Sequence, residues 1–292
     1  MDARTPLFHP HPSKPKLRLP PGSWDTHFHV LGPKAQFPFA STTTIDPGDA
    51  TKEMLFALHE KLGIEHGVFV QSAVHGMDNR VVEDALATTG SRYVGVALLP
   101  PTVEMSELRR LDGLGFRAVR YNFMPHLHQS ASIEQVMGLT PRLAEIGWHL
   151  QIHLDGSLMA DMTPVLARSP VPVVIDHVGR VDAGLGLEQA SFQALLRLMD
   201  DQKFWVKVSG CDRITRSGPP YMDAVPFART LITRFPDRVV WGTDWPHPHH
   251  KGPVPDDGAL VDLIAEIAPS EALRRALMVD NPRRLYASRL RG

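Results

Sequence analysis

Apolar residues gather in short runs that recur along the chain and are separated by more polar segments. The runs span residues 24–30, 66–72, 93–99, 118–123, 149–155, 173–178, 204–210 and 239–245. Each run has the length of a strand and is rich in Val, Ile or aromatic residues. Because these strands are nearly apolar throughout, we expect them to be buried on both faces, as in a parallel sheet covered by helices.

The segments between the runs carry the apolar spacing of helices. Six of them show it clearly, at residues 50–63, 106–115, 132–147, 191–201, 224–236 and 256–268. The first of these collects four apolar residues on one face, Met54, Leu55, Leu58 and Leu62. Ser132 and Gln135 have the spacing of a capping box, which predicts the start of a helix at that position.

The alternation of strand and helix predicts the fold. Repeated along residues 23–292, it favours a (β/α)8 TIM barrel. A doubly wound open sheet is the alternative, and it is disfavoured because no G-x-G-x-x-G motif follows the first strand. Proline crowds residues 6–21, so we expect residues 1–22 to form an extended arm outside the barrel.

Composition and charge exclude several classes of partner. The formal net charge of the 292 residues is -1, so the chain has no basic field to attract nucleic acid or anionic lipid. No stretch approaches the ~20 apolar residues of a membrane span, and the N-terminus lacks the apolar core of a secretory signal. Cys211 is the only cysteine, which excludes an internal disulfide and fits the cytoplasm.

Polar side chains collect where the predicted strands end, which is where TIM barrels place their active sites. In strand order they are His27 and His29, Gln71 and His75, Arg120 and Asn122, His153 and Asp155, Asp176 with His177 and Arg180, Lys207 with Asp212 and Arg213, and Asp244 with His247. Residues i and i+2 of a strand share a face, so His27 and His29 are expected to point together into the barrel mouth.

Each of these residues also has a structural interpretation. A single histidine in a strand is more often a hydrogen-bonded structural group than a ligand, Asp244 could cap a loop, and Arg120 could pair with a surface acid. We interpret His247, His249 and His250 as loop residues. Because several separate strand ends carry His or Asp, a shared functional site is the better interpretation of the set.

The pattern of H-x-H on the first strand, His on the fifth and sixth and Asp on the eighth resembles the amidohydrolase superfamily. More specific blocks resemble its 2-pyrone-4,6-dicarboxylate lactonase group. These blocks are WDTHFHVLGP, HGMDNR, AVRYNF, DHVGR, WGTDWPHPHHKGPVPDDGALVD and VDNPRRLY, and together they span residues 24–286.

The resemblance implies a role for each matching residue. Asp244 corresponds to the general base that activates water, and His27, His29 and His177 correspond to groups that polarise the lactone carbonyl. The arginines that bind substrate carboxylates correspond to Arg120, Arg180 and Arg213. The resemblance also implies hydrolysis without a metal ion. His75, His126 and His153 complete the predicted substrate contacts.

The chain departs from the lactonase pattern at three positions. His126 stands where the group has an arginine, and His153 and the region of Ile45 stand where it has tyrosines. The predicted pocket therefore lacks one fixed cation, which would hold a dicarboxylate less well. We expect a related anionic lactone as the substrate, such as a carboxylated or sulfonated muconolactone, of which 4-sulfomuconolactone is an example.

His153 also raises the alternative of a metal site. Together with His27, His29 and Asp244 it would supply three nitrogens and one oxygen, a donor set suited to Zn²⁺. The predicted cofactor is therefore either none or one divalent metal ion.

The prediction that results is a lactonase acting on a small anionic lactone, in the catabolism of aromatic compounds by resemblance. A metal-dependent decarboxylase of unsaturated carboxylates and an aldarolactone isomerase are alternatives on the same scaffold. A non-catalytic binding barrel is a third interpretation, and it would leave Asp244 without a role.

Overall fold

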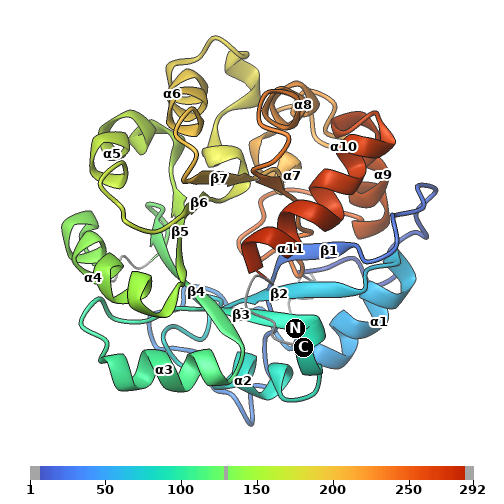
Figure 1. The fold of residues 1–292 in the computed structure, drawn as a ribbon. Coiled ribbons are helices and arrows are strands. Elements are labelled where there is room, and N and C mark those ends of the chain that lie inside the picture. The colour runs from blue at the N-terminus through green and yellow to red at the C-terminus, as the bar shows by residue number, and fades with distance from the viewer. Residues whose placement is uncertain (1–6, 128–130, 287–292) are drawn as a thin grey trace.

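The protein is described by a computed structural model that covers residues 7–127 and 131–286. Eight parallel strands follow one another in sheet order β1 to β8 and surround the centre of the molecule (Figure 1). The strands are β1 (Trp24–Phe28), β2 (His66–Val70), β3 (Tyr93–Ala97), β4 (Phe116–Phe123), β5 (His149–Leu154), β6 (Val173–Ile175), β7 (Phe204–Lys207) and β8 (Val239–Val240). The predicted (β/α)8 barrel is confirmed.

The barrel closes through the residues that follow the short strand β8. Backbone hydrogen bonds run from Thr26 N to Trp241 O at 2.9 Å, from Asp244 N to His27 O at 2.8 Å and from His29 N to Trp245 O at 2.7 Å. The same segment that closes the barrel against β1 therefore carries Asp244 to the end of the strands.

Helices form an outer ring around the strands (Figure 1). The six predicted helical segments correspond to α1 (Lys52–Leu62), α3 (Met105–Gly113), α4 (Ile133–Ile146), α6 (Ala190–Met199), α8 (Val225–Arg234) and α9 (Asp257–Ile267). The capping box of Ser132 and Gln135 is present at the start of α4. Leu55, Leu58 and Leu62 of α1 are buried as predicted, but Met54 is 46% exposed, because it lies at the outer edge of the apolar face.

The described residues also form several shorter helices. They are α2 (Arg80–Leu86), α5 (Met159–Leu166), α7 (Cys211–Ile214), α10 (Glu271–Arg275) and α11 (Asn281–Tyr286). Single turns of tighter helix occur at η1 (Gly90–Arg92), η2 (Gly156–Leu158), η3 (His177–Arg180) and η4 (Ala183–Leu185), and η5 (Ala276–Asp280) is a π-helical turn. Within the described ranges, no helix is both long enough and apolar enough to cross a membrane.

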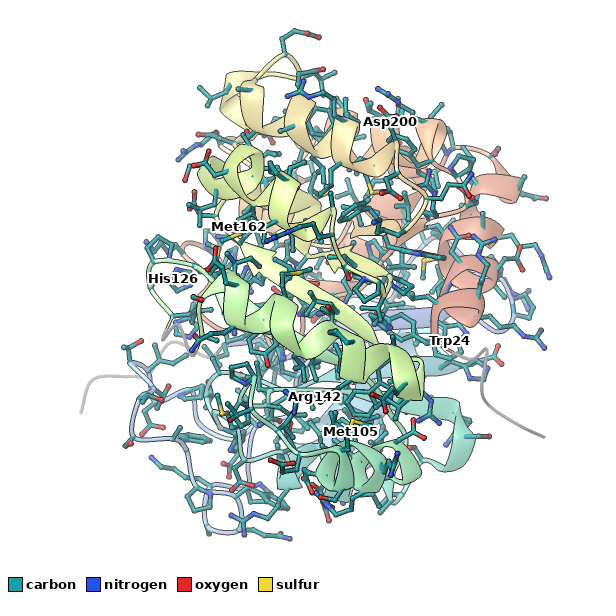
Figure 2. All side chains as sticks on the ribbon, turned by 60° about the vertical axis from the view of Figure 1, so that its left-hand side comes forward. Trp24, Met105, His126, Arg142, Met162 and Asp200 are labelled. Carbon is teal, nitrogen blue, oxygen red and sulfur yellow. The ribbon has the colours of Figure 1, made fainter. Side chains whose placement is uncertain are left out.

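The two ends of the barrel differ in chemistry. Trp24, at the start of β1, and His126, beyond the end of β4, mark these opposite ends in Figure 2. Trp24 belongs to an apolar cluster that fills the N-terminal end together with valines of β2 and β3 and with Tyr286 of α11. The C-terminal end instead gathers the charged and imidazole side chains. As in other TIM barrels, one end of the barrel therefore contributes to stability and the other end carries the candidate active site.

The described part of the predicted arm, residues 7–22, contains no helix or strand and lies against the barrel. Asp256 and Asp262 accept hydrogen bonds from its backbone, the first from Ser13 N at 2.9 Å and the second from Lys16 N at 2.7 Å. The arm is thereby tied to the N-terminal half of α9. Residues 1–6 of the predicted arm and 287–292 of the predicted barrel lie outside the described residues.

Candidate active site

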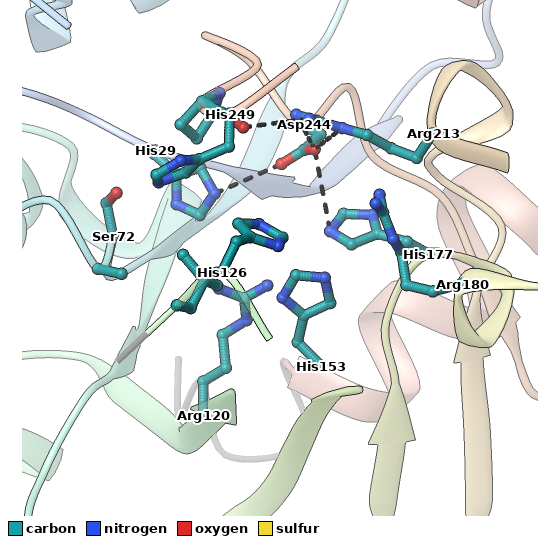
Figure 3. A pocket seen from close by; sticks show the side chains of 13 residues that line it. His29, Ser72, Arg120, His126, His153, His177, Arg180, Arg213, Asp244 and His249 are labelled. Carbon is teal, nitrogen blue, oxygen red and sulfur yellow. Dashed lines mark hydrogen bonds and ion pairs between the residues drawn. The ribbon is translucent and has the colours of Figure 1, made fainter. Parts of the chain in front are cut away.

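A pocket with an empty volume of about 480 Å³ opens at the C-terminal end of the strands (Figure 3). Eight of the residues predicted from the sequence line it: His29, Arg120, His126, His153, His177, Arg180, Arg213 and Asp244. They come from β4, β5, η3, α7 and the segments that follow β1, β4 and β8. Folding thus brings together side chains that are more than 200 residues apart in sequence.

Asp244 is the centre of the site. Its Oδ1 atom lies 3.4 Å from Nε2 of His29 and 3.6 Å from Nε2 of His27. Its Oδ2 atom accepts from Nη2 of Arg213 at 2.6 Å and from Nε of Arg213 at 2.9 Å, and it lies 3.9 Å from Nε2 of His177. Burial alone would raise the pKa of Asp244, but the charge of Arg213, the imidazoles of His177 and His27 and a hydrogen bond with His29 together hold the pKa well below its ordinary value. The carboxylate is therefore ionised across the neutral range.

The hydrogen-bond partner of His29 determines which of its two ring nitrogens carries the proton. Nδ1 lies 2.7 Å from the carbonyl oxygen of Val70, and a carbonyl oxygen can only accept a hydrogen bond. Nδ1 therefore carries the proton of the neutral ring. Nε2, which faces Asp244, is left as an acceptor toward the pocket.

A second group of charged side chains lies buried beneath the pocket. Asp176 follows β6, and its Oδ2 atom accepts from Nε of Arg120 at 2.8 Å and from Nε2 of Gln151 at 3.0 Å. Lys207, at the end of β7, lies 3.5 Å from the other oxygen of Asp176 and 3.1 Å from Nδ1 of His27. Burial lowers the pKa of Lys207 to about 8 despite the opposing charge of Asp176. These buried contacts hold the side chains of Arg120 and His27 in place.

His153 and His177 complete the wall of the pocket. Nδ1 of His153 lies 3.1 Å from Oδ1 of Asn122, so this amide oxygen accepts its proton, and Nε2 is buried with no hydrogen-bond partner among the described residues. Nδ1 of His177 lies 3.1 Å from the hydroxyl of Ser209. Burial lowers the pKa of His177 to about 4 and that of His153 well below its ordinary value. Both rings are therefore neutral near pH 7.

Unusual backbone conformations place two of these groups. The turn η3 has a left-handed backbone at each of its residues, with φ of 51° at His177, 54° at Val178 and 52° at Arg180. Asp244 has the same feature, with φ of 63°. Such conformations cost non-glycine residues about 1–2 kcal/mol each, and they cluster at functional sites. Strain is thus concentrated where side chains are directed into the pocket.

Arg180 is the cation of the pocket that lacks an acidic partner. It is partly buried, and no carboxylate of the described residues lies within ion-pair distance of its guanidinium. Burial, together with the charge of Arg213, lowers the pKa of Arg180 to about 10, so it remains cationic at neutral pH. An unpaired buried charge is costly, and an anionic ligand would satisfy it.

Histidines form the boundary between this pocket and a larger outer cavity of about 1320 Å³. The rings of His126 and His249 lie with their centroids 5.3 Å apart, and both residues line both cavities. Burial lowers the pKa of His249 to about 4 and that of His126 below its ordinary value, with nearby cations adding to both shifts. The predicted contact residue His126 therefore stands at the entrance as a neutral ring.

His75 is not among the residues that line the pocket. Nε2 of His75 accepts from Gly32 N at 3.2 Å, and its Nδ1 lies 3.2 Å from Pro38 O. Both ring nitrogens are thus engaged with the loop that follows β1. Ile45 packs on the hydrophobic core and also lies outside the lining of the pocket.

Some residues of the site are not among the predicted ones. Ser72, Ala73, Leu127, Pro248 and His249 line the pocket. Asp176 and Lys207 stand at strand ends in the sequence, but no motif assigns a role to them. His249 could have been predicted from its position five residues after Asp244. A residue in the short loop that follows a catalytic residue remains close to that residue.

The predicted metal site can be tested against the geometry. One ligand atom each of His27, His177 and Asp244 lie within 4.8 Å of one another, close enough to share an ion. His29 and His153, which belong to the predicted ligand set, are not part of this compact group. The group therefore has the residue types of a metal site.

The donor atoms of this group do not fit a metal ion. Oδ2 of Asp244 is already held by two hydrogen bonds from Arg213. Nδ1 of His27 faces the ammonium group of Lys207, which places the ring proton on the Nε2 atom that a metal would need. Two fixed cations thus lie against the residues that would be ligands.

Comparison with known proteins places the chain in a family. The family model described as amidohydrolase matches residues 24–287. The chain therefore belongs to the amidohydrolase family. The crystal structure of an Agrobacterium tumefaciens protein in its apo form superposes with a TM-score of 0.84 at 27% identity, and the match covers 94% of this chain and 98% of that one.

Relatives with assigned activities are similar over nearly the whole length. A 2-pyrone-4,6-dicarboxylate hydrolase of Comamonas testosteroni is 41% identical over 96% of this chain and 94% of its own. A 4-sulfomuconolactone hydrolase of Rhizobium radiobacter is 40% identical over 92% and 91%. A D-galactarolactone isomerase of Agrobacterium fabrum is 27% identical over 93% of each chain. The two relatives named as hydrolases are thus closer than the isomerase.

Proposed function

We propose that this protein hydrolyses a small anionic lactone by attack of water on the lactone carbonyl. The observation that carries the proposal is the position of Asp244, an ionised carboxylate surrounded by imidazoles, in a pocket that also exposes the unpaired cation Arg180. The similarity to relatives named as lactone hydrolases, at 41% and 40% identity, supports the same reaction.

Asp244 is suited to act as the general base. Its Oδ1 atom and Nε2 of His29 are 3.4 Å apart, and both can accept a proton. A water molecule that lies beside both atoms would donate one hydrogen to Oδ1 of Asp244 and direct the other toward Nε2 of His29, which leaves a lone pair of its oxygen for the carbonyl carbon. As the new C–O bond forms, the water proton moves to Asp244.

Collapse of the tetrahedral intermediate breaks the bond between the carbonyl carbon and the ring oxygen. Negative charge first develops on the carbonyl oxygen, and a hydrogen-bond donor in a buried site stabilises it strongly. Asp244, which now holds the proton taken from water, returns it to the departing ring oxygen. The product is the open-chain hydroxy or enol acid, and the carboxylate is regenerated.

Arginines give the pocket its preference for anions. Arg180 lacks an acidic partner among the described residues, and Arg120 lines the pocket while its Nε donates to Asp176. A guanidinium presents parallel N–H groups that match a carboxylate or a sulfonate. Because His126 puts a neutral ring where the predicted pattern has an arginine, we propose a muconolactone such as 4-sulfomuconolactone as the substrate, in preference to 2-pyrone-4,6-dicarboxylate.

We further propose that the reaction needs no resident metal ion. The donor set supports this, since Arg213 occupies Oδ2 of Asp244 and compensates its charge, and Lys207 faces Nδ1 of His27, so that Nε2 of His27 carries a proton instead of a free lone pair. The expected assay result is activity that survives a chelator without loss. Activity that disappears with the chelator and returns with a divalent ion would contradict this part of the proposal.

An assay of several substrates tests the proposed reaction. The purified protein would be mixed with 4-sulfomuconolactone, 2-pyrone-4,6-dicarboxylate, an aldarolactone and a neutral lactone of similar size. Hydrolysis releases one acid equivalent and adds the mass of water, whereas isomerisation conserves mass and decarboxylation releases CO2. We expect acid release from at least one anionic lactone and little from the neutral one. Turnover with conserved mass would favour the isomerase, which the more distant relative represents.

A further inference from the structure

Lys207 is a fully buried lysine to which neither its position in the sequence nor the proposed reaction assigns a role. Its side chain has 0% relative exposure and is not among the side chains that line the pocket. Three groups surround its Nζ atom: the carbonyl oxygen of Thr26 at 3.0 Å, Nδ1 of His27 at 3.1 Å and Oδ1 of Asp176 at 3.5 Å. An ammonium group has three protons and no lone pair, so each of the three neighbours acts as an acceptor.

This arrangement determines the proton position on His27. Nδ1 of His27 also lies 3.5 Å from Asp176, which could accept a proton from it, but the ammonium of Lys207 is closer and cannot accept. Oδ2 of Asp176 accepts from Arg120 and Gln151, and its Oδ1 atom lies 3.5 Å from the ammonium of Lys207, which can supply a proton to it in place of His27. The neutral ring of His27 therefore carries its single proton on Nε2.

The proton on Nε2 is directed at the reacting centre. Nε2 of His27 is buried, has no hydrogen-bond partner among the described residues and lies 3.6 Å from Oδ1 of Asp244. A buried N–H group without an acceptor costs about 1–3 kcal/mol, and this cost is recovered when an acceptor arrives. The negatively charged carbonyl oxygen of the tetrahedral intermediate is such an acceptor.

We infer that Lys207 is a positioning residue that fixes His27 as an Nε2–H donor for the reacting carbonyl oxygen and so prevents His27 from acting as a metal ligand. The inference rests on the proposed lactone hydrolysis. His27 and His29 then have opposite roles although they are one residue apart. Val70 makes Nε2 of His29 an acceptor for water, whereas Lys207 makes Nε2 of His27 a donor to the substrate.

Nuclear magnetic resonance of the wild-type protein tests the proton position without any substrate. Histidine labelled with ¹⁵N gives separate signals for protonated and unprotonated ring nitrogens, and the signals of His27 are those missing from a His27→Asn variant. We expect Nε2 to be the protonated nitrogen near pH 7. A proton on Nδ1 would overturn the inference even if lactone hydrolysis is confirmed.

Kinetics of Lys207→Met separate a positioning role from a merely structural one. With the tautomer no longer fixed, kcat is expected to fall by about 100-fold, the loss typical of one misplaced oxyanion donor, while KM changes by less than about threefold. Lys203→Met, which removes a partly exposed lysine just before β7, is the matched control and should leave both constants unchanged.

A double-mutant cycle completes the test. If Lys207 acts through His27, then Lys207→Met has no further effect on kcat in a His27→Asn background. Independent, multiplicative losses would overturn the inference. Metal content gives a readout besides activity: wild-type protein should bind no zinc, whereas Lys207→Met should gain zinc affinity, because His27 can then present an unprotonated Nε2. Tightly bound zinc in the wild type would also overturn it.

The two proposals fail in distinguishable ways. If no lactone is opened but His27 is protonated on Nε2 and Lys207→Met gains zinc, the proposed function is wrong and the role of Lys207 stands. If lactones are opened but the proton of His27 lies on Nδ1, the proposed function stands and the role of Lys207 is wrong. Because the resonance experiment uses wild-type protein, it remains decisive even if Lys207→Met does not fold.

Discussion

Nη2 of Arg213 lies 2.6 Å from Oδ2 of Asp244, so the proposed base is held by a cation on the side opposite to the histidines. The ion pair fixes the carboxylate and leaves its Oδ1 atom toward His27 and His29. A strongly depressed pKa makes a carboxylate a weaker base. The ion pair with Arg213 therefore keeps the carboxylate of Asp244 oriented and ionised, but it also makes that carboxylate a weaker base.

Asp244→Asn should abolish most of the activity. The amide keeps the shape of the side chain but cannot take a proton from water, so kcat is expected to fall by about 10²–10⁴-fold. The fold should survive, since Arg213 keeps its hydrogen bond to Pro248 O at 3.1 Å and its contact with Asp212. Steady-state kinetics and thermal unfolding of the same preparation check both statements. Activity near that of the wild type would remove Asp244 from the mechanism.

Arg180→Met should act mainly on substrate binding. The guanidinium has no acidic partner among the described residues, so its loss costs the protein little and the anionic substrate much. Since charge pairing holds substrate and transition state alike, KM should rise by at least about tenfold while kcat changes little. Arg234→Met is the control, because it removes a surface arginine that pairs with Asp200, away from the pocket. A loss confined to kcat would instead place Arg180 at the reacting centre.

His126→Arg should change the preference among lactones. The residue lines both the pocket and the outer cavity, and in the wild type its pKa is lowered by burial and by the nearby Arg180. An arginine at this position restores the cation of the 2-pyrone-4,6-dicarboxylate lactonase pattern, so the ratio of kcat/KM for 2-pyrone-4,6-dicarboxylate over 4-sulfomuconolactone should rise by about tenfold. Parallel assays of the two substrates measure this ratio. An unchanged ratio would show that His126 does not contact the second anionic group.

Stability should decrease on mild acidification because the histidines of the site are buried as neutral rings. The pKa of His177 is about 4 in the folded protein and 6.5 for an ordinary histidine, so the unfolded chain binds more protons between these values. The free energy of unfolding therefore falls as the pH drops from 6.5 toward 4, by about 3 kcal/mol for this residue alone. Urea unfolding at several pH values measures the trend.

Two variants locate the origin of that trend. His177→Gln removes one of the titrating rings and should reduce the pH dependence of stability in this window by the share of that residue, while the other buried neutral histidines keep the rest. His11→Gln changes an exposed histidine and should leave it as in the wild type. A dependence that begins only below pH 3.8 would instead point to the carboxylates Asp176 and Asp244, whose pKa values are depressed by their cationic neighbours.

The fold was accessible from the sequence because each strand is apolar on both faces. The predicted runs at 173–178 and 239–245 nevertheless extend well past β6 and β8, since the chain leaves the sheet to deliver His177 and Asp244. Helices α2 and α5 gave no clear signal, because both are short and α5 contains Pro164.

Less of the candidate site than of the fold could be predicted from the sequence. The positions of His29, His177 and Asp244 follow from their strand ends, but contacts across the barrel do not. Lys207 meets His27 over 180 residues of intervening sequence, and no local pattern encodes such a pair. His75 is a different case: a polar residue after a strand can have both ring nitrogens engaged by a neighbouring loop, which the strand-end pattern does not reveal.

Closure of the barrel and delivery of Asp244 depend on the same few residues after β8. During synthesis, a chain that lacks this segment exposes β1 and β8 as two open sheet edges, which are sites for aggregation. It also lacks the proposed base. Catalytic activity should therefore serve as a reporter of complete assembly: any molecule that turns over substrate has joined its first strand to its last.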